Sequence, residues 1–273
     1  MRRLLLAALL ALASPVQAQE GCGAEGACTL ENGRYYIALP PSPDGPVPAV
    51  VFLHGFGGSG EGTMRQRGMI EAITARGYAF LAPDGQPRPG RGGLRWDFRG
   101  EPGADRRDED AFLRDVVADA ARHGVDPERV ILAGFSNGAF QVVYQACRDP
   151  GAFAAWAPVS GGFWRPHPEG CAGPVRLFQT HGWRDATVPL EGRPLGGGAV
   201  AQGDIFEGLA LFRRANGCAW DNPDGYDETG QFLRRRWDCA PGSALELALF
   251  PGGHGVPSGW AEMMLDWFEG LEG

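Results

Sequence analysis

One serine in the sequence lies in the run 134–138 (GFSNG), with a glycine two residues away on either side. The apolar run 129–133 precedes it and a segment with helical periodicity, 138–147, follows, so we expect a sharp strand-to-helix turn here. A strained turn of this kind needs small residues beside the serine, and it holds the hydroxyl exposed for nucleophilic attack. We therefore predict that Ser136 is a catalytic nucleophile.

A serine nucleophile needs a general base and an acid that orients the base. His254 lies in the glycine-rich run PGGHG, directly after the last predicted strand, where a loop can carry the imidazole over the sheet to the serine. Asp185 follows the predicted strand 175–180, and we predict that its carboxylate orients the imidazole. Asp204 and Glu191 are alternative acids, but neither follows a predicted strand.

The other four histidines suit the role of base less well. His54 ends a predicted strand facing a loop, and a structural role is expected for it. His181 ends a strand but precedes the candidate acid, so we expect it to support Asp185 from behind. His123 stands at a helix end and His167 between prolines, and both are expected at the surface.

The tetrahedral intermediate of acyl transfer carries an oxyanion, which backbone N–H groups can stabilise. The run 54–58 (HGFGG) directly follows the apolar run 49–53, at the place where such a donor is needed. The second donor is the residue after the nucleophile. We therefore assign the oxyanion hole to the N–H groups of Phe56 and Asn137.

Three tryptophans stand in glycine- or proline-rich loops near predicted strand ends: Trp96, Trp164 and Trp183. We predict that they bind substrate, in an acyl pocket or at its mouth. For each of them the alternative is an aromatic residue that only packs within its loop. Trp96 belongs to the segment 85–106, rich in Gly, Pro and Arg, which we expect to be a long surface loop.

The elements that must position these residues alternate along the chain. The predicted strands are 34–39, 49–53, 78–82, 129–133, 153–159, 175–180 and 245–250. The predicted helices are 63–75, 108–122, 138–147, 205–215 and 260–268. This alternation predicts an α/β fold with a mostly parallel sheet that helices cover on both faces. No internal repeat or linker divides the chain, so we expect one catalytic domain over residues 19–273.

The composition excludes several classes of function. All 25 basic residues are Arg, so a lysine Schiff base, a P-loop lysine and a Ser–Lys dyad are excluded. The formal net charge of −8 argues against a nucleic-acid partner, which would require a basic face.

The first residues read as a signal peptide, 1–18. A basic start at Arg2 and Arg3 leads into an apolar run, 4–13, and small residues then favour cleavage before Gln19. The apolar run is too short to cross a bilayer, and no later segment reaches eighteen apolar residues. We therefore expect a secreted protein, extracellular or periplasmic, without a membrane span.

Six cysteines remain after this segment, and an exported protein can oxidise them to disulfides. Six thiols allow fifteen pairings, and the sequence alone does not choose among them. Proximity along the chain favours three pairs: Cys22 with Cys28, Cys147 with Cys171, and Cys218 with Cys239. No C-x-x-C is present and no His stands at ligand spacing from a Cys, so no metal site is expected.

Several motifs occur in one order along the chain: LHGFGGSG, a DEDAFL segment, GFSNGA, FAAWAPVSG, HGWRDATVP and GGHG. In this combination, over roughly residues 30 to 270, the sequence resembles the secreted polyhydroxybutyrate depolymerase and feruloyl esterase group of α/β-hydrolases. The cysteines at 147 and 171, and at 218 and 239, stand where that group often has them. Trp183 departs from the group, which often has a small residue there.

The resemblance implies a secreted carboxylic-ester hydrolase with the triad Ser136, Asp185 and His254, acting on hydroxyalkanoate polyester or oligomers. Its mechanism needs no metal or organic cofactor. The chain ends at Gly273 without a linker or binding domain, which favours oligomers or small esters over crystalline polymer. The alternatives are a feruloyl or acetylxylan esterase acting on plant cell-wall esters, a peptidase of the same fold, and a noncatalytic polymer- or carbohydrate-binding protein. The oligomeric state stays open.

Overall fold

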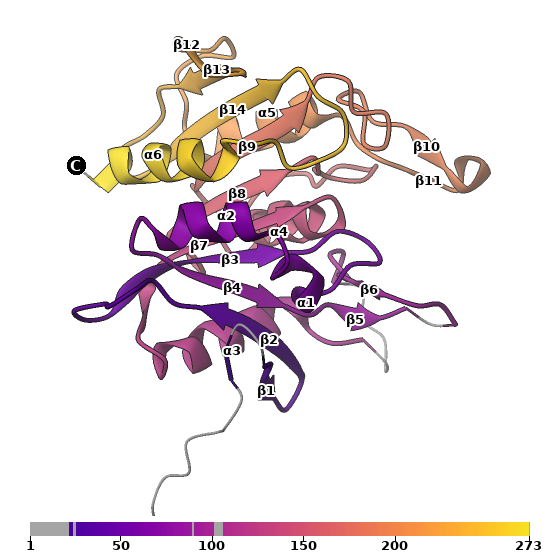
Figure 1. The fold of residues 1–273 in the computed structure, drawn as a ribbon. Helices are drawn as coiled ribbons and strands as arrows, with labels where there is room; N and C mark the ends of the chain where they lie inside the picture. The colour runs from indigo at the N-terminus through magenta and orange to yellow at the C-terminus, as the bar shows by residue number, and fades with distance from the viewer. Residues whose placement is uncertain (1–21, 24–25, 89, 101–105, 273) are drawn as a thin grey trace, which may run out of the picture.

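The computed structural model describes residues 22–23, 26–88, 90–100 and 106–272, and the predicted signal peptide 1–18 lies outside them. Within these residues a ten-stranded sheet crosses the molecule (Figure 1). In spatial order its strands are β1 (Cys28–Leu30), β2 (Gly33–Ala38), β4 (Ala79–Pro83), β3 (Val47–Leu53), β7 (Val125–Phe135), β8 (Ala155–Val159), β9 (Arg176–Gly182), β14 (Ala244–Phe250), β13 (Phe232–Trp237) and β12 (Gly225–Thr229). The six strands from β4 to β14 are parallel, and both edges are antiparallel.

Helices cover both faces of this sheet. On one face lie α3 (Glu109–Ala121), α4 (Asn137–Arg148) and α5 (Ile205–Ala215), and on the other α2 (Arg67–Thr74) and α6 (Trp260–Glu272). The sequence of strand β3 is apolar because both of its faces are buried. Ala49, Val51 and Leu53 pack in the apolar cluster on the face of α3, α4 and α5, while Val50 and Phe52 pack in the cluster on the face of α2 and α6. A parallel strand buried on both faces has no side for polar residues. The predicted mostly parallel sheet with helices on both faces is confirmed.

Several segments differ from the predictions, among them β1, where no strand was predicted. The helix expected over 63–75 is two helices, α1 (Gly60–Thr63) and α2, with a turn between them. The segment 85–106 contains a small antiparallel hairpin, β5 (Gln86–Pro87) with β6 (Leu94–Arg95). The segment after α5 forms the β12–β13 hairpin at the sheet edge. No strand was predicted there, because neither GYDET nor FLRRRW contains a continuous apolar run.

Another hairpin, β10 (Pro194–Leu195) with β11 (Val200–Ala201), closes through the short turn η1 (Gly196–Gly198). It projects on the side towards which the parallel strands point (Figure 1).

Three disulfides are present, Cys22–Cys28, Cys147–Cys171 and Cys218–Cys239, the pairs that proximity favoured. Two of them join the ends of α4 and α5 to the segments that enter β9 and β14. Both therefore brace the edge of the sheet where the parallel strands begin. None of the described helices has the length and apolar character needed to cross a bilayer.

Candidate active site

Ser136 occupies the turn between β7 and α4 in a backbone conformation that side chains rarely adopt, with φ 55° and ψ −115°. The glycines around it are needed because of close backbone contacts. A methyl group on Gly138 would lie 2.3 Å from the Leu53 carbonyl oxygen, and one on Gly134 would lie 2.7 Å from the Gly138 carbonyl carbon. The turn is thus a strained strand-to-helix elbow of the kind expected from GFSNG.

The loops that follow β9 and β14 carry the other two residues, and they are joined backbone to backbone. The Trp183 N–H donates to the Phe250 carbonyl at 2.8 Å, and the Arg184 N–H donates to that of Gly252 at 2.9 Å. At Gly182, a methyl group would lie 2.3 Å from the Gly253 carbonyl oxygen, so only glycine allows this approach. The pairing sets the loop of His254 beside the loop of Asp185.

The three predicted residues form one hydrogen-bonded chain. The Ser136 Oγ lies 2.9 Å from His254 Nε2, and His254 Nδ1 lies 2.7 Å from Asp185 Oδ2. A carboxylate only accepts, so Nδ1 carries the proton and Nε2 is left to accept from the serine hydroxyl. The imidazole packs on Phe135 with ring centroids 4.7 Å apart, which fixes its plane. This is the arrangement in which a histidine can remove the serine proton.

Asp185 is buried and held by three donors. Its Oδ1 accepts from the N–H groups of Thr187 at 2.9 Å and Val188 at 2.8 Å, while Oδ2 accepts from His254. Burial by itself raises the pKa of this carboxyl, but the hydrogen bonds from His254 and Val188 outweigh burial, and the pKa is lowered. The group is therefore an anion that can stabilise an imidazolium.

His181 lies behind the acid. Its Nε2 donates to the Val188 carbonyl at 2.7 Å and is 3.6 Å from Asp185 Oδ2, and its side chain is fully buried. Burial lowers the pKa of His181, which keeps the ring neutral. The ring thus braces the turn whose amides hold Asp185 and is placed as the sequence predicted.

His54 is the buried histidine of a second network. Its Nδ1 donates to the Gly55 carbonyl at 2.8 Å and its Nε2 accepts from the Gly85 N–H at 3.0 Å. Burial lowers its pKa, so this ring is also neutral. Both nitrogens are engaged by backbone, which agrees with the structural role expected for it.

Trp96 belongs to that second network, and this corrects the prediction that it binds substrate. Its side chain is only 1% exposed, and its indole N–H donates to the His54 carbonyl at 3.0 Å. Its backbone N–H and carbonyl bond the side-chain amide of Asn137, at 2.7 and 3.2 Å. The tryptophan therefore fixes its own segment to the start of α4, because packing and these three hydrogen bonds hold it inside.

The two other tryptophans differ from each other. Trp183 is 65% exposed and stands two residues before Asp185. Trp164 is half-buried among aromatic rings, with centroids 5.9 Å from both Phe98 and Phe140, and the Arg99 guanidinium lies 5.1 Å above its ring. Phe98 stands in the predicted loop as an isolated aromatic and Phe140 in the predicted helix 138–147, so sequence spacing did not connect either ring with Trp164.

Of the two predicted oxyanion donors, Asn137 directly follows the nucleophile, and Phe56 follows Gly55, where an added methyl group would lie 3.5 Å from the Ser136 Cβ. Asn137 is the first residue of α4, so its backbone N–H has no acceptor within the helix. Its side chain is committed to Trp96, which leaves this N–H as its free donor. Phe56 follows β3, which pairs with β7, and its N–H makes no backbone hydrogen bond among the described residues.

Among the described residues, one cluster combines three potential metal ligands, Cys22, Cys28 and His123. The two sulfurs are joined in a disulfide, so they are not thiolate ligands.

The sequence profile of the phospholipase and carboxylesterase family matches residues 39–195, more than half of the chain. The chain belongs to the phospholipase/carboxylesterase family. In this family member the matched segment contains Ser136 and Asp185, while His254 lies beyond it. The narrower resemblance to polyhydroxybutyrate depolymerases stays a prediction.

A relative named as an esterase, NocK of Nocardia uniformis subsp. tsuyamanensis, is 34% identical over 160 residues. The match takes in 56% of this phospholipase/carboxylesterase chain and 44% of the relative, so the chain spans less than half of that protein's length.

Solved structures show the α/β-hydrolase fold for this family member. An acetyl xylan esterase from Aspergillus awamori superposes with a TM-score of 0.64 at 17% identity, over 88% of this chain and 94% of that one. A carboxylesterase from Bacillus cereus superposes with a TM-score of 0.57 at 16% identity, over the same shares.

Proposed function

We propose that this chain is a serine carboxylesterase that works through an acyl-enzyme on Ser136. The hydrogen-bonded chain from Ser136 through His254 to Asp185 carries the proposal, because it places an activating base at 2.9 Å from a strained, accessible serine. Family membership supports the reaction class.

In the first half-reaction His254 Nε2 takes the hydroxyl proton as Ser136 Oγ attacks the ester carbonyl carbon. The N–H groups of Phe56 and Asn137 donate to the oxyanion, and Asp185 stabilises the imidazolium. His254 then gives the proton to the alkoxide, which leaves as the alcohol. In the second half-reaction His254 deprotonates a water molecule, which attacks the acyl carbon. His254 then returns the proton to Ser136 Oγ as the bond to the acyl carbon breaks and the carboxylic acid leaves. The chain's own residues suffice for every step.

The substrate we favour is an oligomer or polyester of hydroxyalkanoate, on the strength of the motif order LHGFGGSG, GFSNGA, HGWRDATVP and GGHG. Two exposed aromatics on loops beside the site, Phe56 at 60% and Trp183 at 65%, offer an apolar surface to such a substrate. The second candidate is a plant cell-wall ester, supported by the fold shared with an acetyl xylan esterase. Three disulfides support secretion of a catalytic domain formed by residues 19–273.

The decisive test compares Ser136→Ala with a matched control, Ser160→Ala. Ser160 also has φ 55° and also ends a parallel strand, but it is fully buried. We expect a fluorophosphonate probe to label the wild type and Ser160→Ala but not Ser136→Ala. Hydrolysis of p-nitrophenyl butyrate should fall by about 10⁴-fold or more in Ser136→Ala alone. A wild type that stays unlabelled would favour a noncatalytic binding protein.

The wild type and Ser136→Ala also distinguish the candidate substrates. Hydroxybutyrate oligomers, methyl ferulate and acetylated xylan are offered to the wild type, with Ser136→Ala as the blank. We expect the highest kcat/KM for the hydroxybutyrate oligomers. A higher value for methyl ferulate or acetylated xylan would replace that substrate by a cell-wall ester.

A further inference from the structure

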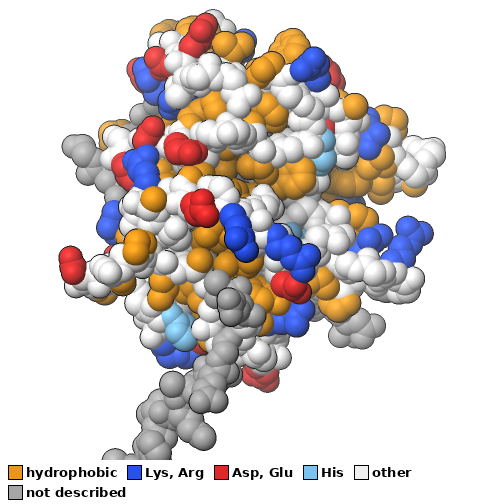
Figure 2. Space-filling model, viewed as in Figure 1, with side chains coloured by type: hydrophobic (Ala, Val, Ile, Leu, Met, Phe, Trp, Pro, Cys, Tyr) orange, Lys and Arg blue, Asp and Glu red, His pale blue; other side chains and the backbone are white. Residues whose placement is uncertain are grey.

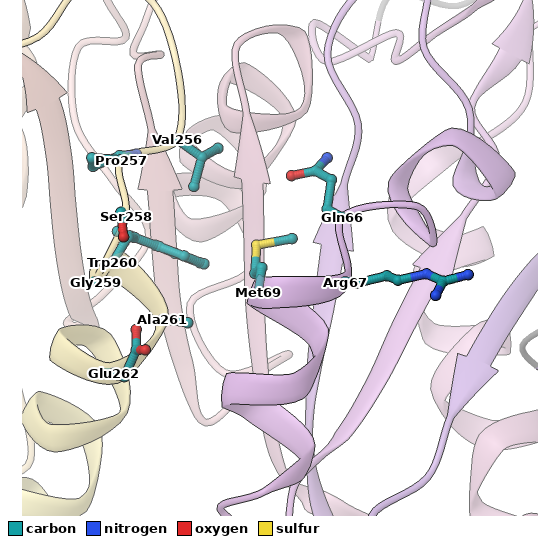
Figure 3. A pocket seen from close by; sticks show the side chains of 11 residues that line it. Gln66, Arg67, Met69, Val256, Pro257, Ser258, Gly259, Trp260, Ala261 and Glu262 are labelled. Carbon is teal, nitrogen blue, oxygen red and sulfur yellow. The ribbon is translucent and has the colours of Figure 1, made fainter.

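A pocket of about 550 Å³ lies between the start of α2 and the segment that leads from the catalytic loop into α6 (Figure 3). Met69 of α2 and Val256 of the loop both line it, and the Trp260 side chain extends from the start of α6 towards Met69. In Figure 2 hydrophobic side chains gather in the hollow between the part with α6 and β14 and the part with α2 and β3. A volume of this size suits a small organic group.

The pocket adjoins the catalytic histidine. Val256 stands two residues after His254, so their Cα atoms are at most about 7 Å apart. Phe135, whose ring packs on the His254 imidazole, belongs to the same apolar cluster as Met69, Val256 and Trp260. The imidazole therefore packs on the same apolar layer of the fold that supplies Met69, Val256 and Trp260 to the pocket.

The proposed reaction requires each part of the bound ester to lie on a particular side of Ser136. His254 Nε2 must protonate the departing alkoxide, so the alcohol portion of the ester has to lie on the side of the imidazole. The oxyanion donors, Phe56 and Asn137, define another side. We infer that the pocket of Met69, Val256 and Trp260 is the subsite for the leaving-group alcohol. This inference rests on the proposed esterase reaction and specifies which half of the ester the pocket selects.

The lining indicates the chemistry of that alcohol. The walls combine apolar and polar residues: Met69, Val256 and Trp260 stand beside Gln66 and Ser258, and the Trp260 ring packs against Phe52. The rim holds one charge of each sign, Arg67 and Glu262, and the Arg67 side chain extends away from Trp260 (Figure 3). With one charge of each sign on its rim, the pocket thus favours a neutral alcohol with a body about the size of one ring.

Transfer of one common acyl group to different alcohols measures binding of the alcohol without any change in the acyl group. With p-nitrophenyl acetate as common donor, every variant forms the same acetyl-enzyme, and an added alcohol competes with water for it. The product ratio of benzyl acetate to acetate then reports binding of benzyl alcohol. The ratio of ethyl acetate to acetate, obtained with ethanol, reports the transfer step with an alcohol too small to fill the pocket. The filling variants are Met69→Trp and Val256→Phe. Met64→Trp is the matched control, since Met64 packs against the same cluster but does not line the pocket.

We expect Met69→Trp and Val256→Phe to lower the benzyl alcohol ratio about tenfold or more. The ethanol ratio, and both ratios in Met64→Trp, should stay within about twofold. Normal nitrophenol release with an unchanged benzyl alcohol ratio in both filled variants would overturn the subsite and leave the esterase proposal intact. A wild type that releases no nitrophenol would instead contradict the esterase proposal itself.

Discussion

The loops after β14 and β3 each carry a histidine beside glycines at the same edge of the sheet, and the two rings meet different partners. His254 lies between a carboxylate and a serine hydroxyl, with its side chain 18% exposed. His54 lies between two backbone groups, those of Gly55 and Gly85, and is buried. In the proposed reaction the His254 ring transfers the proton, whereas the His54 ring links two loops.

The same contrast holds for the acids of the two regions. Asp185 receives the His254 ring and two backbone amides, whereas Asp84 receives the Gly60 N–H and the Arg34 guanidinium, each at 2.6 Å. Both carboxylates are buried after a strand. The chemistry of each region is therefore set by the partner of its carboxylate, because a titratable ring can relay a proton and an arginine cannot.

The largest expected effect comes from exchanging the two acids for amides. Asp185→Asn should lower kcat by about 10³- to 10⁴-fold, because the amide no longer holds the productive tautomer of His254. Asp84→Asn should leave kcat within about threefold and lower the free energy of unfolding by about 2 kcal/mol, since it breaks the pair with Arg34. Ester hydrolysis and urea unfolding of both variants measure this. Equal losses of activity would erase the distinction between the regions.

A smaller effect is expected from crowding the contact between the catalytic loops. Gly182→Ala would place a methyl group 2.3 Å from the Gly253 carbonyl oxygen and push the His254 loop away. We expect kcat/KM to fall about 10²-fold. Gly255→Ala is the control, because a methyl group there meets nothing within 4 Å. Similar kinetics for the two variants would show that the backbone pairing does not position His254.

The structural network should respond through stability. His54→Ala removes the bonds to Gly55 and Gly85 and leaves a gap beside Trp96, so the free energy of unfolding should fall by about 2 kcal/mol. His123→Ala, at a partly exposed ring, should change it by less than about 0.5 kcal/mol. Chemical denaturation measures both free energies of unfolding. Equal losses in the two variants would show that His54 does not link the two loops.

The smallest expected effect is a dependence of the free energy of unfolding on pH. Burial lowers the pKa of His54 and of His181 below 6.5, so below that pH the unfolded chain binds more protons than the folded one. The free energy of unfolding should therefore decrease as the pH falls from about 6.5, by at most about 1.4 kcal/mol per unit for each ring. Urea unfolding between pH 7.5 and 5 measures the slope. It should be shallower in His54→Ala, and an equal slope would contradict a neutral His54.

Much of the fold was predictable because apolar runs and glycines act over a few residues. The strand 129–133, the turn GFSNG and the helix after it follow from local sterics alone. The β12–β13 hairpin escaped notice, since an edge strand with one solvated face, such as FLRRRW, carries no apolar run.

The candidate active site likewise has some features that the sequence predicts and others that depend on the tertiary structure. The sequence by itself determined the elbow at Ser136 and the order of base and acid candidates, because backbone strain and strand ends are local properties. Only the tertiary structure decided which histidine meets which carboxylate, that Trp96 is a buried crosslink, and that α2 and the loop after His254 enclose a pocket. Those outcomes depend on contacts between segments far apart in the chain: 69 residues separate His254 from Asp185, and 42 separate Trp96 from His54. Packing rather than sequence spacing sets such distances.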